Sequence, residues 1–356
     1  MFVLCALSVA FALGGCARDP EKQSLTDLTV SSAKSLVRTD SDMQTVLNKF
    51  SSFDGKAVEK ITPVEARKQP TIADAVKGVL ADKGQDSNPA VLVPGVTTTE
   101  RTVPGAAGAM PTTVYTPDGP GPFPVILYFH GGGWVFADRK VYDGGARGIA
   151  KEANAIVVSV DYRLAPENKF PAAHDDALAA YRWVAANAKS LNGDPQRLAI
   201  AGESAGGNLA VATAIAAKKS GLTQPKHVLA IYPVAQTNMQ TESYQKYADA
   251  VPLNRPMMLW FISQVTKSPA DLKDPRIDLV HANLQGLPPV TIINAEVDPL
   301  RDDGALLETA LRSAGTPVER QVYPNVTHEF FGTAAVVTKA KAAQAYAGER
   351  LKADLQ

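Results

Sequence analysis

The chain has 356 residues, which is enough for one large domain or two ordinary ones. Its hydrophobic content of 45% and charged content of 20% are ordinary for a soluble globular protein. Lys plus Arg and Asp plus Glu number 36 each, so the sequence lacks the basic excess typical of proteins that bind nucleic acids or anionic membranes.

The first sixteen residues carry an export signature. Both cysteines, Cys5 and Cys16, lie here, so the rest of the chain holds no disulfide, thiolate zinc site or cysteine nucleophile. Phe2 to Leu13 is an apolar run too short to span a bilayer but suited to the core of a secretion signal. It leads into LGGC, which resembles a bacterial lipobox, although no Lys or Arg precedes the run. We therefore predict a signal over residues 1–16 with lipidation at Cys16; the alternative is a buried N-terminal helix.

Residues 17–56 are polar and weakly patterned, which predicts a tether with one amphipathic helix. The apolar positions of that helix are Met43, Val46, Leu47, Phe50 and Phe53.

Two clearer helices are predicted within residues 57–97. TPVEARK places Thr62 at the N-cap, a proline next and a glutamate at the third helical position, which together form a capping box. The second helix begins at Thr71 and ends at Gly84.

From residue 98 to 356, short apolar runs alternate with helical patterns. Strands are predicted at 100–105, 110–117, 124–130, 155–163, 197–202, 227–234, 288–300 and 318–324. Helices are predicted at 172–188, 208–221 and 302–315. This order predicts an α/β fold with a mostly parallel eight-stranded sheet and helices on both faces. Residues 236–280 contain no clear strand and predict a helical insertion above the carboxyl edge of the sheet, where ligands bind in open α/β sheets.

The stretch FHGGGWV begins at Phe129, where a predicted strand ends. Three successive glycines allow a tight turn or the close approach of another group to the backbone. The second strong motif is GESAG around Ser204, between a predicted strand and a predicted helix. This context is typical of a nucleophile elbow, in which the flanking glycines make room for a sharp turn that exposes the serine. A tight turn without chemistry is the alternative.

A nucleophilic serine needs N–H donors for the oxyanion. The residue after the nucleophile, Ala205, supplies one, and the HGGG loop supplies the others. Close approach of the substrate therefore explains the three glycines, and His130 is expected to anchor the loop.

The serine also needs a base, which follows the nucleophile in hydrolases with this elbow. Three of the five histidines follow Ser204. His227 opens a strand too near the serine, and His281 precedes the last two strands. His328 comes just after the last strand, where the base belongs.

The acid should follow the penultimate strand. Asp298 lies directly beyond it, whereas Glu296 belongs to the strand. Asp302 and Asp303 suit the first turn of the next helix, where the helix dipole favours carboxylates. We therefore predict Asp298 as the acid.

These motifs resemble the bacterial hormone-sensitive-lipase-like family of α/β-hydrolases. The resemblance covers roughly residues 100–350 and rests on HGGGW (130–134), VDYRLAPE (160–167), GESAGGN (202–208), GLPPV (286–290), DPLRDD (298–303) and HEF (328–330). It implies carboxylic-ester hydrolysis without a cofactor or metal, and a cap built from residues 40–90 and 236–280. It also implies that Gly132 and Gly133 donate to the oxyanion. Glu203 and Glu329 depart from the family pattern, where Asp and Gly are frequent.

We therefore predict a serine carboxylesterase for short- to medium-chain esters, with Ser204, His328 and Asp298 as the triad. The alternatives are a lipase, amidase or lactonase with the same triad, or a non-catalytic binding module. The expected partner is a small ester and not a nucleic acid, and the membrane is reached only through lipid on Cys16. The expected location is the periplasm or cell envelope, with the cytoplasm as the alternative.

The roles of two further groups of residues are less clearly indicated by the sequence. Asp161, Arg163 and Glu167 predict a buried ion pair that holds the loop beside the oxyanion strand. Aromatic and methionine side chains near the site predict either an acyl pocket or core packing; these are Trp134, Met257, Met258, Trp260 and Phe261.

Overall fold

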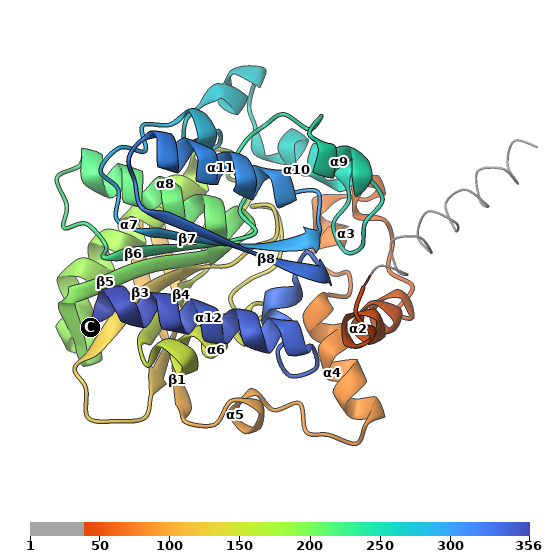
Figure 1. Ribbon diagram of the computed structural model, residues 1–356, viewed down its shortest axis with the longest axis horizontal. Coiled ribbons are helices and arrows are strands. Elements are labelled where there is room, and N and C mark those ends of the chain that lie inside the picture. The colour runs from red at the N-terminus through yellow and green to blue at the C-terminus, as the bar shows by residue number, and fades with distance from the viewer. Residues whose placement is uncertain (1–38) are drawn as a thin grey trace, which may run out of the picture.

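The computed structural model describes residues 39–356 (Figure 1). The predicted signal, the lipidation site at Cys16 and the tether as far as residue 38 lie outside the described residues.

The centre of the molecule is one eight-stranded sheet. Its strands are β1 (Val96–Gly105), β2 (Gly108–Pro117), β3 (Phe123–Phe129), β4 (Ile156–Val160), β5 (Gly193–Glu203), β6 (His227–Ile231), β7 (Val290–Val297) and β8 (Val318–Thr327). They lie in the order β1-β2-β4-β3-β5-β6-β7-β8. The β1/β2 and β2/β4 pairs are antiparallel, and all other neighbours are parallel. The predicted fold class is confirmed.

Helices cover both faces of the sheet (Figure 1). One face carries α7 (Ala172–Asn187), α8 (Ala205–Lys219) and α11 (Arg301–Ser313), and the other carries α6 (Asp143–Ala153) and α12 (Thr338–Leu355). Strand side chains alternate between the two cores: Leu127 packs with the first group, and Ile126 and Tyr128 with the second. Each buried strand is therefore apolar on both sides, which explains its continuous hydrophobic run.

The sequence reasoning missed α6 and α12. The pattern of α6 is DGGARGIAKEA, in which three glycines lower the intrinsic helix propensity. Packing against α12 stabilises this helix in the folded chain.

The amino-terminal segment of the described chain is helical, and two of its four α-helices follow the predicted starts at Thr62 and Thr71. The four helices are α2 (Ser41–Ser51), α3 (Pro63–Ala66), α4 (Ile72–Asp82) and α5 (Pro89–Leu92). The predicted capping box at Thr62 is present, and the helix that begins after Thr71 has a second capping box that was not predicted. Met43, Val46 and Leu47 are buried, and α2 packs against α4.

The tether predicted for residues 17–56 is consequently too long. Its last part, from Ser41 to Ser51, is a helix of the folded body, because its apolar stripe finds a partner in α4. Phe53, expected on that stripe, lies beyond the helix and is exposed.

The insertion between β6 and β7 is helical, as predicted. It contains α9 (Glu242–Lys246) and α10 (Arg255–Val265), and both lie beyond the carboxyl edge of the sheet in Figure 1. Short 3₁₀ helices complete the described chain, at Val58–Lys60, Ala188–Leu191, Pro269–Lys273, Leu279–His281 and Phe330–Thr333. Over residues 39–356, no helix has the length and apolar character needed to cross a membrane.

Candidate active site

Ser204 occupies the sharp turn between β5 and α8. Its φ of 57° and ψ of −117° lie in a region that side-chain-bearing residues rarely adopt. A Cβ on Gly202 would lie 2.1 Å from the carbonyl oxygen of Gly206, and a Cβ on Gly206 would lie 2.0 Å from that of Phe129. Only glycine fits at these two positions, so the predicted elbow is present and its glycines are required by close packing.

The structure brings Ser204, His328 and Asp298 together. Val297 of β7 pairs with Thr327 of β8, so the next residue of each strand emerges beside the other at the carboxyl edge. His328 Nδ1 lies 2.7 Å from Asp298 Oδ2, and His328 Nε2 lies 3.0 Å from Ser204 Oγ. An imidazole protonated at Nδ1 donates to the carboxylate and accepts the serine proton at Nε2.

The carboxylate of Asp298 is itself held in position. Asp298 is fully buried, and the N–H of Leu300 donates to its Oδ1 at 2.8 Å. Burial acts to lower the pKa of His328. The charge and hydrogen bond of Asp298, and the charges of Glu329 and Glu203, act in the opposite direction and together raise this pKa above its usual 6.5. The site therefore stabilises the imidazolium that forms when His328 takes a proton.

The HGGG loop presents backbone donors beside the serine. Gly132 and Gly133 have φ values of 92° and 59°, and in residues 39–356 neither N–H donates a hydrogen bond. Ala205 is the first residue of α8, where a helix leaves N–H groups without intrahelical partners. The three predicted oxyanion donors therefore belong to two elements that meet at Ser204.

His130 has the anchoring position that the sequence suggests. Its ring stacks on Tyr162 at a centroid distance of 4.3 Å, and the hydroxyl of Tyr162 donates to the carbonyl of His130 at 2.8 Å. These contacts hold the start of the HGGG loop against the chain that follows β4.

A cavity of about 460 Å³ lies over the serine. Both predicted cap segments line it, Phe50 and Ile72 from the amino-terminal helices and Leu253, Met257 and Phe261 from the insertion. The wall is mostly apolar, so it can enclose a hydrocarbon group.

The other aromatic and methionine candidates have a packing role. Met258 and Trp134 are buried in the core, and Trp260 packs against it without lining the cavity. Among the candidates, only Met257 and Phe261 face the cavity.

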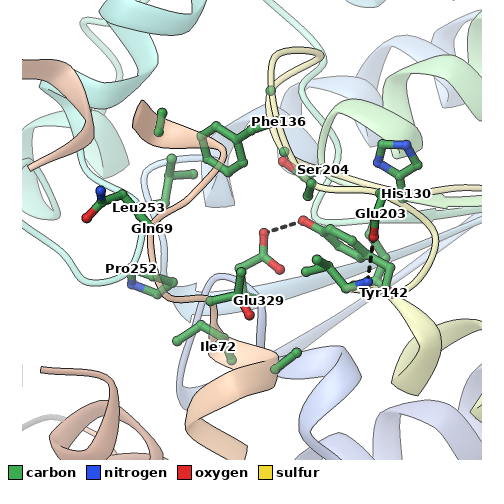
Figure 2. A pocket seen from close by; sticks show the side chains of 18 of the residues that line it. Gln69, Ile72, His130, Phe136, Tyr142, Glu203, Ser204, Pro252, Leu253 and Glu329 are labelled. Atoms are coloured by element: carbon green, nitrogen blue, oxygen red, sulfur yellow. Dashed lines mark hydrogen bonds between the residues drawn. The ribbon is translucent and has the colours of Figure 1, made fainter. Parts of the chain in front are cut away.

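Two carboxyl groups near the relay have roles that sequence reasoning left open. Glu203 is buried below the elbow and accepts hydrogen bonds from the hydroxyls of Tyr128 and Tyr232. Burial raises the pKa of Glu203 to about 8, although the two hydrogen bonds act to lower it. Glu329 accepts a hydrogen bond from the hydroxyl of Tyr142 at 2.5 Å and lines the cavity (Figure 2). Burial raises its pKa, while His328 and Tyr142 act in the opposite direction.

The VDYRLAPE segment does not form the single buried ion pair that was predicted. Each of its charged residues pairs with a different part of the chain instead. The pairs are Asp161 with Arg139, Arg163 with Asp176, and Glu167 with Arg67. The last pair joins the cap to this loop, because one partner belongs to the segment that follows α3. All three partners come from other parts of the fold.

The remaining groups do not suggest a metal centre. Within the described residues, no cluster of three or more His, Cys, Asp or Glu side chains could hold a metal ion. His281 is exposed, and His227 lies at the amino end of β6, away from the cavity.

Known proteins share this architecture. The family model described as alpha/beta hydrolase fold matches residues 126–332. The chain belongs to the α/β-hydrolase family. Carboxylesterase NlhH of Mycobacterium tuberculosis is 40% identical over 280 residues, which cover 76% of this hydrolase and 86% of the relative. Ethyl acetate hydrolase of Pseudomonas putida is 38% identical over 218 residues, covering 60% and 68% of the two chains.

Solved structures agree with this assignment. A thermostable esterase from Pseudomonas putida ECU1011 superposes with a TM-score of 0.80 at 32% identity, covering 90% of this hydrolase and 98% of that chain. The thermophilic carboxylesterase EstE1, cloned from a metagenomic library, has a TM-score of 0.76 at 34% identity, covering 83% and 99%.

Proposed function

We propose that this hydrolase cleaves carboxylic esters through an acyl-enzyme. The observation that carries the proposal is the hydrogen-bonded series Ser204–His328–Asp298, in which Ser204 occupies an elbow at the wall of a cavity. The names of the relatives support an ester substrate: they are a carboxylesterase and an ethyl acetate hydrolase.

The geometry fits a two-step reaction. Ser204 Oγ attacks the ester carbonyl while His328 Nε2 takes its proton, and Asp298 stabilises the imidazolium. The N–H groups of Gly132, Gly133 and Ala205 hold the oxyanion that develops on the carbonyl oxygen. When the carbon–oxygen bond to the alcohol breaks, His328 returns the proton to the leaving oxygen.

Water then completes the cycle. His328 takes a proton from the water as its oxygen attacks the acyl carbon, and it returns that proton to Ser204 Oγ as the acid product leaves. The ester and water are the only reactants that the two steps require besides the side chains of the protein.

We propose short- to medium-chain acyl groups as the substrates. Support comes from the cap, whose two segments enclose the cavity over Ser204 and leave a bounded space for the acyl chain. A lipase acting on long chains remains the second candidate, because the cavity wall is largely apolar.

Hydrolysis of p-nitrophenyl esters from acetate to palmitate by the purified chain tests both proposals, with Ser204→Ala as the control. Activity that peaks at short chains and disappears in the variant supports the carboxylesterase. Activity that rises toward palmitate contradicts the short-chain proposal and favours the lipase. A folded protein without activity on any ester contradicts ester hydrolysis and directs the search to amides and lactones, and then to a binding function.

We also propose that the protein is exported and anchored by lipid on Cys16. The support is the apolar run from Phe2 to Leu13 followed by the lipobox-like LGGC. Metabolic labelling with an alkynyl fatty acid should mark the wild type in the membrane fraction and should fail in Cys16→Ala. Equal labelling of both proteins, or none of the wild type, contradicts the proposal.

A further inference from the structure

Glu329 occupies an unusual backbone position directly after His328. Its φ of 67° lies in the left-handed region, which glycine adopts freely and which costs a residue with a side chain about 1 kcal/mol. Strained positions of this kind tend to persist where the side chain has a function. The question is what this carboxylate does in the cavity.

The side chain of Glu329 projects from the position next to His328 into the cavity. Figure 2 shows its carboxylate between Ser204 on one side and Pro252 and Leu253 on the other. Tyr142 donates to Oε1, whereas Oε2 accepts no hydrogen bond from any residue in the described part of the chain. One oxygen is therefore positioned by the protein, and the other is open to a ligand.

Among residues 39–356, no Lys or Arg in the cavity wall neutralises this carboxylate. Arg67 lines the cavity, but both oxygens of Glu167 and two backbone carbonyls accept its N–H groups. The other charged lining residues are acidic or are histidines. Asp161 is paired with Arg139, and Asp138 accepts backbone N–H bonds at its own turn. Among the described lining residues, the imidazole of His328 is thus the nearest group that can carry a positive charge beside Glu329.

The position of Glu329 places it on the side of the cavity that receives the alcohol part of the ester. His328 Nε2 must hand its proton to the leaving oxygen, so the alcohol part of the ester lies on the His328 side of the reacting carbon. Glu329 is the next residue and lines the same cavity.

We propose that Glu329 is a specificity-determining residue that favours esters whose alcohol part carries a positively charged ammonium group. The proposal rests on the ester hydrolysis proposed above. In its ionised form, the Glu329 carboxylate in this largely apolar cavity attracts a cation more strongly than it would in water, and the neutral analogue of the same shape gains nothing from it. Glu329 then orients the alcohol through its free Oε2, while Tyr142 fixes the other oxygen.

A matched pair of substrates tests this directly. Acetylcholine and 3,3-dimethylbutyl acetate have the same shape and differ by the positive charge in the alcohol part. In the wild type, we expect kcat/KM to be about tenfold higher for acetylcholine. Glu329→Gln retains the size of the side chain and an acceptor for Tyr142, so we expect the ratio of the two kcat/KM values, measured at one pH, to fall to about one. Glu349→Gln, on the exposed side of α12, is the control and should keep the wild-type ratio.

A second variant and a second substrate pair keep the proposal open to refutation. Glu329→Gly suits the positive φ and should also lose the preference, even if the glutamine variant folds poorly. Ethyl 3-(trimethylammonio)propionate and ethyl 4,4-dimethylpentanoate place the charge in the acyl part. A larger preference for the cation in this pair contradicts the assignment to the alcohol part.

The outcomes separate this proposal from the proposed function. Turnover of both esters without a preference in the wild type, or a preference that survives in both Glu329 variants, overturns the role of Glu329 alone. No turnover of any neutral ester by a folded wild type overturns ester hydrolysis, and the role of Glu329 with it.

Discussion

Within residues 39–356, the protein contains two hydrogen-bonded series of acid, histidine and hydroxyl, at opposite ends of its sheet. At the carboxyl end, His328 joins Asp298 at 2.7 Å and Ser204 at 3.0 Å. At the amino end, His227 joins Asp354 of α12 at 2.6 Å and Thr291 of β7 at 3.0 Å. The distances are nearly equal, and both imidazoles are buried. Hydrogen-bond geometry alone therefore does not distinguish an active site from a structural contact.

The surroundings of the two hydroxyls do distinguish them. Thr291 lies within β7, paired with Leu229 and Glu319, and is 1% exposed. Ser204 lies at an elbow with positive φ, at the wall of the cavity and beside the N–H groups of the HGGG loop. Only the second arrangement leaves room for a carbonyl carbon and donors for its oxygen. We therefore expect variants of the two series to separate activity from stability.

The largest expected effect is on the two hydroxyls. Ser204→Ala should lower kcat toward p-nitrophenyl butyrate by roughly 10⁶-fold, because both half-reactions pass through this oxygen. Thr291→Val removes the hydroxyl of the other series at similar volume and should leave kcat within about twofold. Steady-state kinetics on the two purified variants measure this contrast. A comparable loss in Thr291→Val would mean that the amino-end series takes part in the reaction.

The next effect concerns the two acids. Asp298→Asn should lower kcat by about 10⁴-fold, since an amide favours the wrong imidazole tautomer and no longer stabilises the imidazolium. Asp354→Asn should leave kcat unchanged. If Asp298→Asn retained most of the activity, another carboxylate, such as Glu329, would have to orient His328.

A third prediction uses the pH dependence of kcat/KM. His328 must be neutral to accept the serine proton, and its pKa is raised, so the acid limb should have its midpoint above 6.5. Asp298, Glu329 and Glu203 are the acidic groups whose charges raise this pKa. Glu329→Gln removes one of them and should move the midpoint down by up to about one pH unit. Asp354→Asn serves as the control and should not move it; a shift in both variants would point to a general change in the fold.

The smallest effect is on stability at the amino end. The hydrogen bond with His227 lowers the pKa of Asp354 below its usual 3.8, so the ionised form stabilises the folded state. That contribution is present above the unfolded pKa and is lost as the pH falls through the folded one. Asp354→Asn should reduce the free energy of unfolding by about 1 kcal/mol at pH 7, and the difference should shrink below pH 4. Urea denaturation at several pH values measures it. An undiminished difference at pH 3 would contradict an ionic origin.

Local chain chemistry determined most of the candidate site. The glycines around Ser204 and in the HGGG loop could be recognised from short motifs, although some of the groups that crowd them are distant in sequence, such as Phe129 beside Gly206. Asp298 and His328 follow from chain order, because parallel strands bring their carboxyl ends to one edge of the sheet. The capping box at Thr62 and the helix start at Thr71 are likewise local, and the structure has both as predicted.

Tertiary structure decided whatever depends on a distant partner. The glycine-rich α6 is helical because it packs on α12, and residues 41–51 belong to the folded body because α4 receives their apolar stripe. The ion pairs of Asp161, Arg163 and Glu167 connect to segments that no local pattern indicates. Glu329 was visible in the sequence only as a departure from a motif. Its direction into the cavity depends on the hydrogen bond from Tyr142. The absence of a neutralising Lys or Arg from the described wall depends on Arg67 and on the cap residues that line the cavity. A sequence shows which groups the chain carries, but the energy of a charge depends on what surrounds it in space.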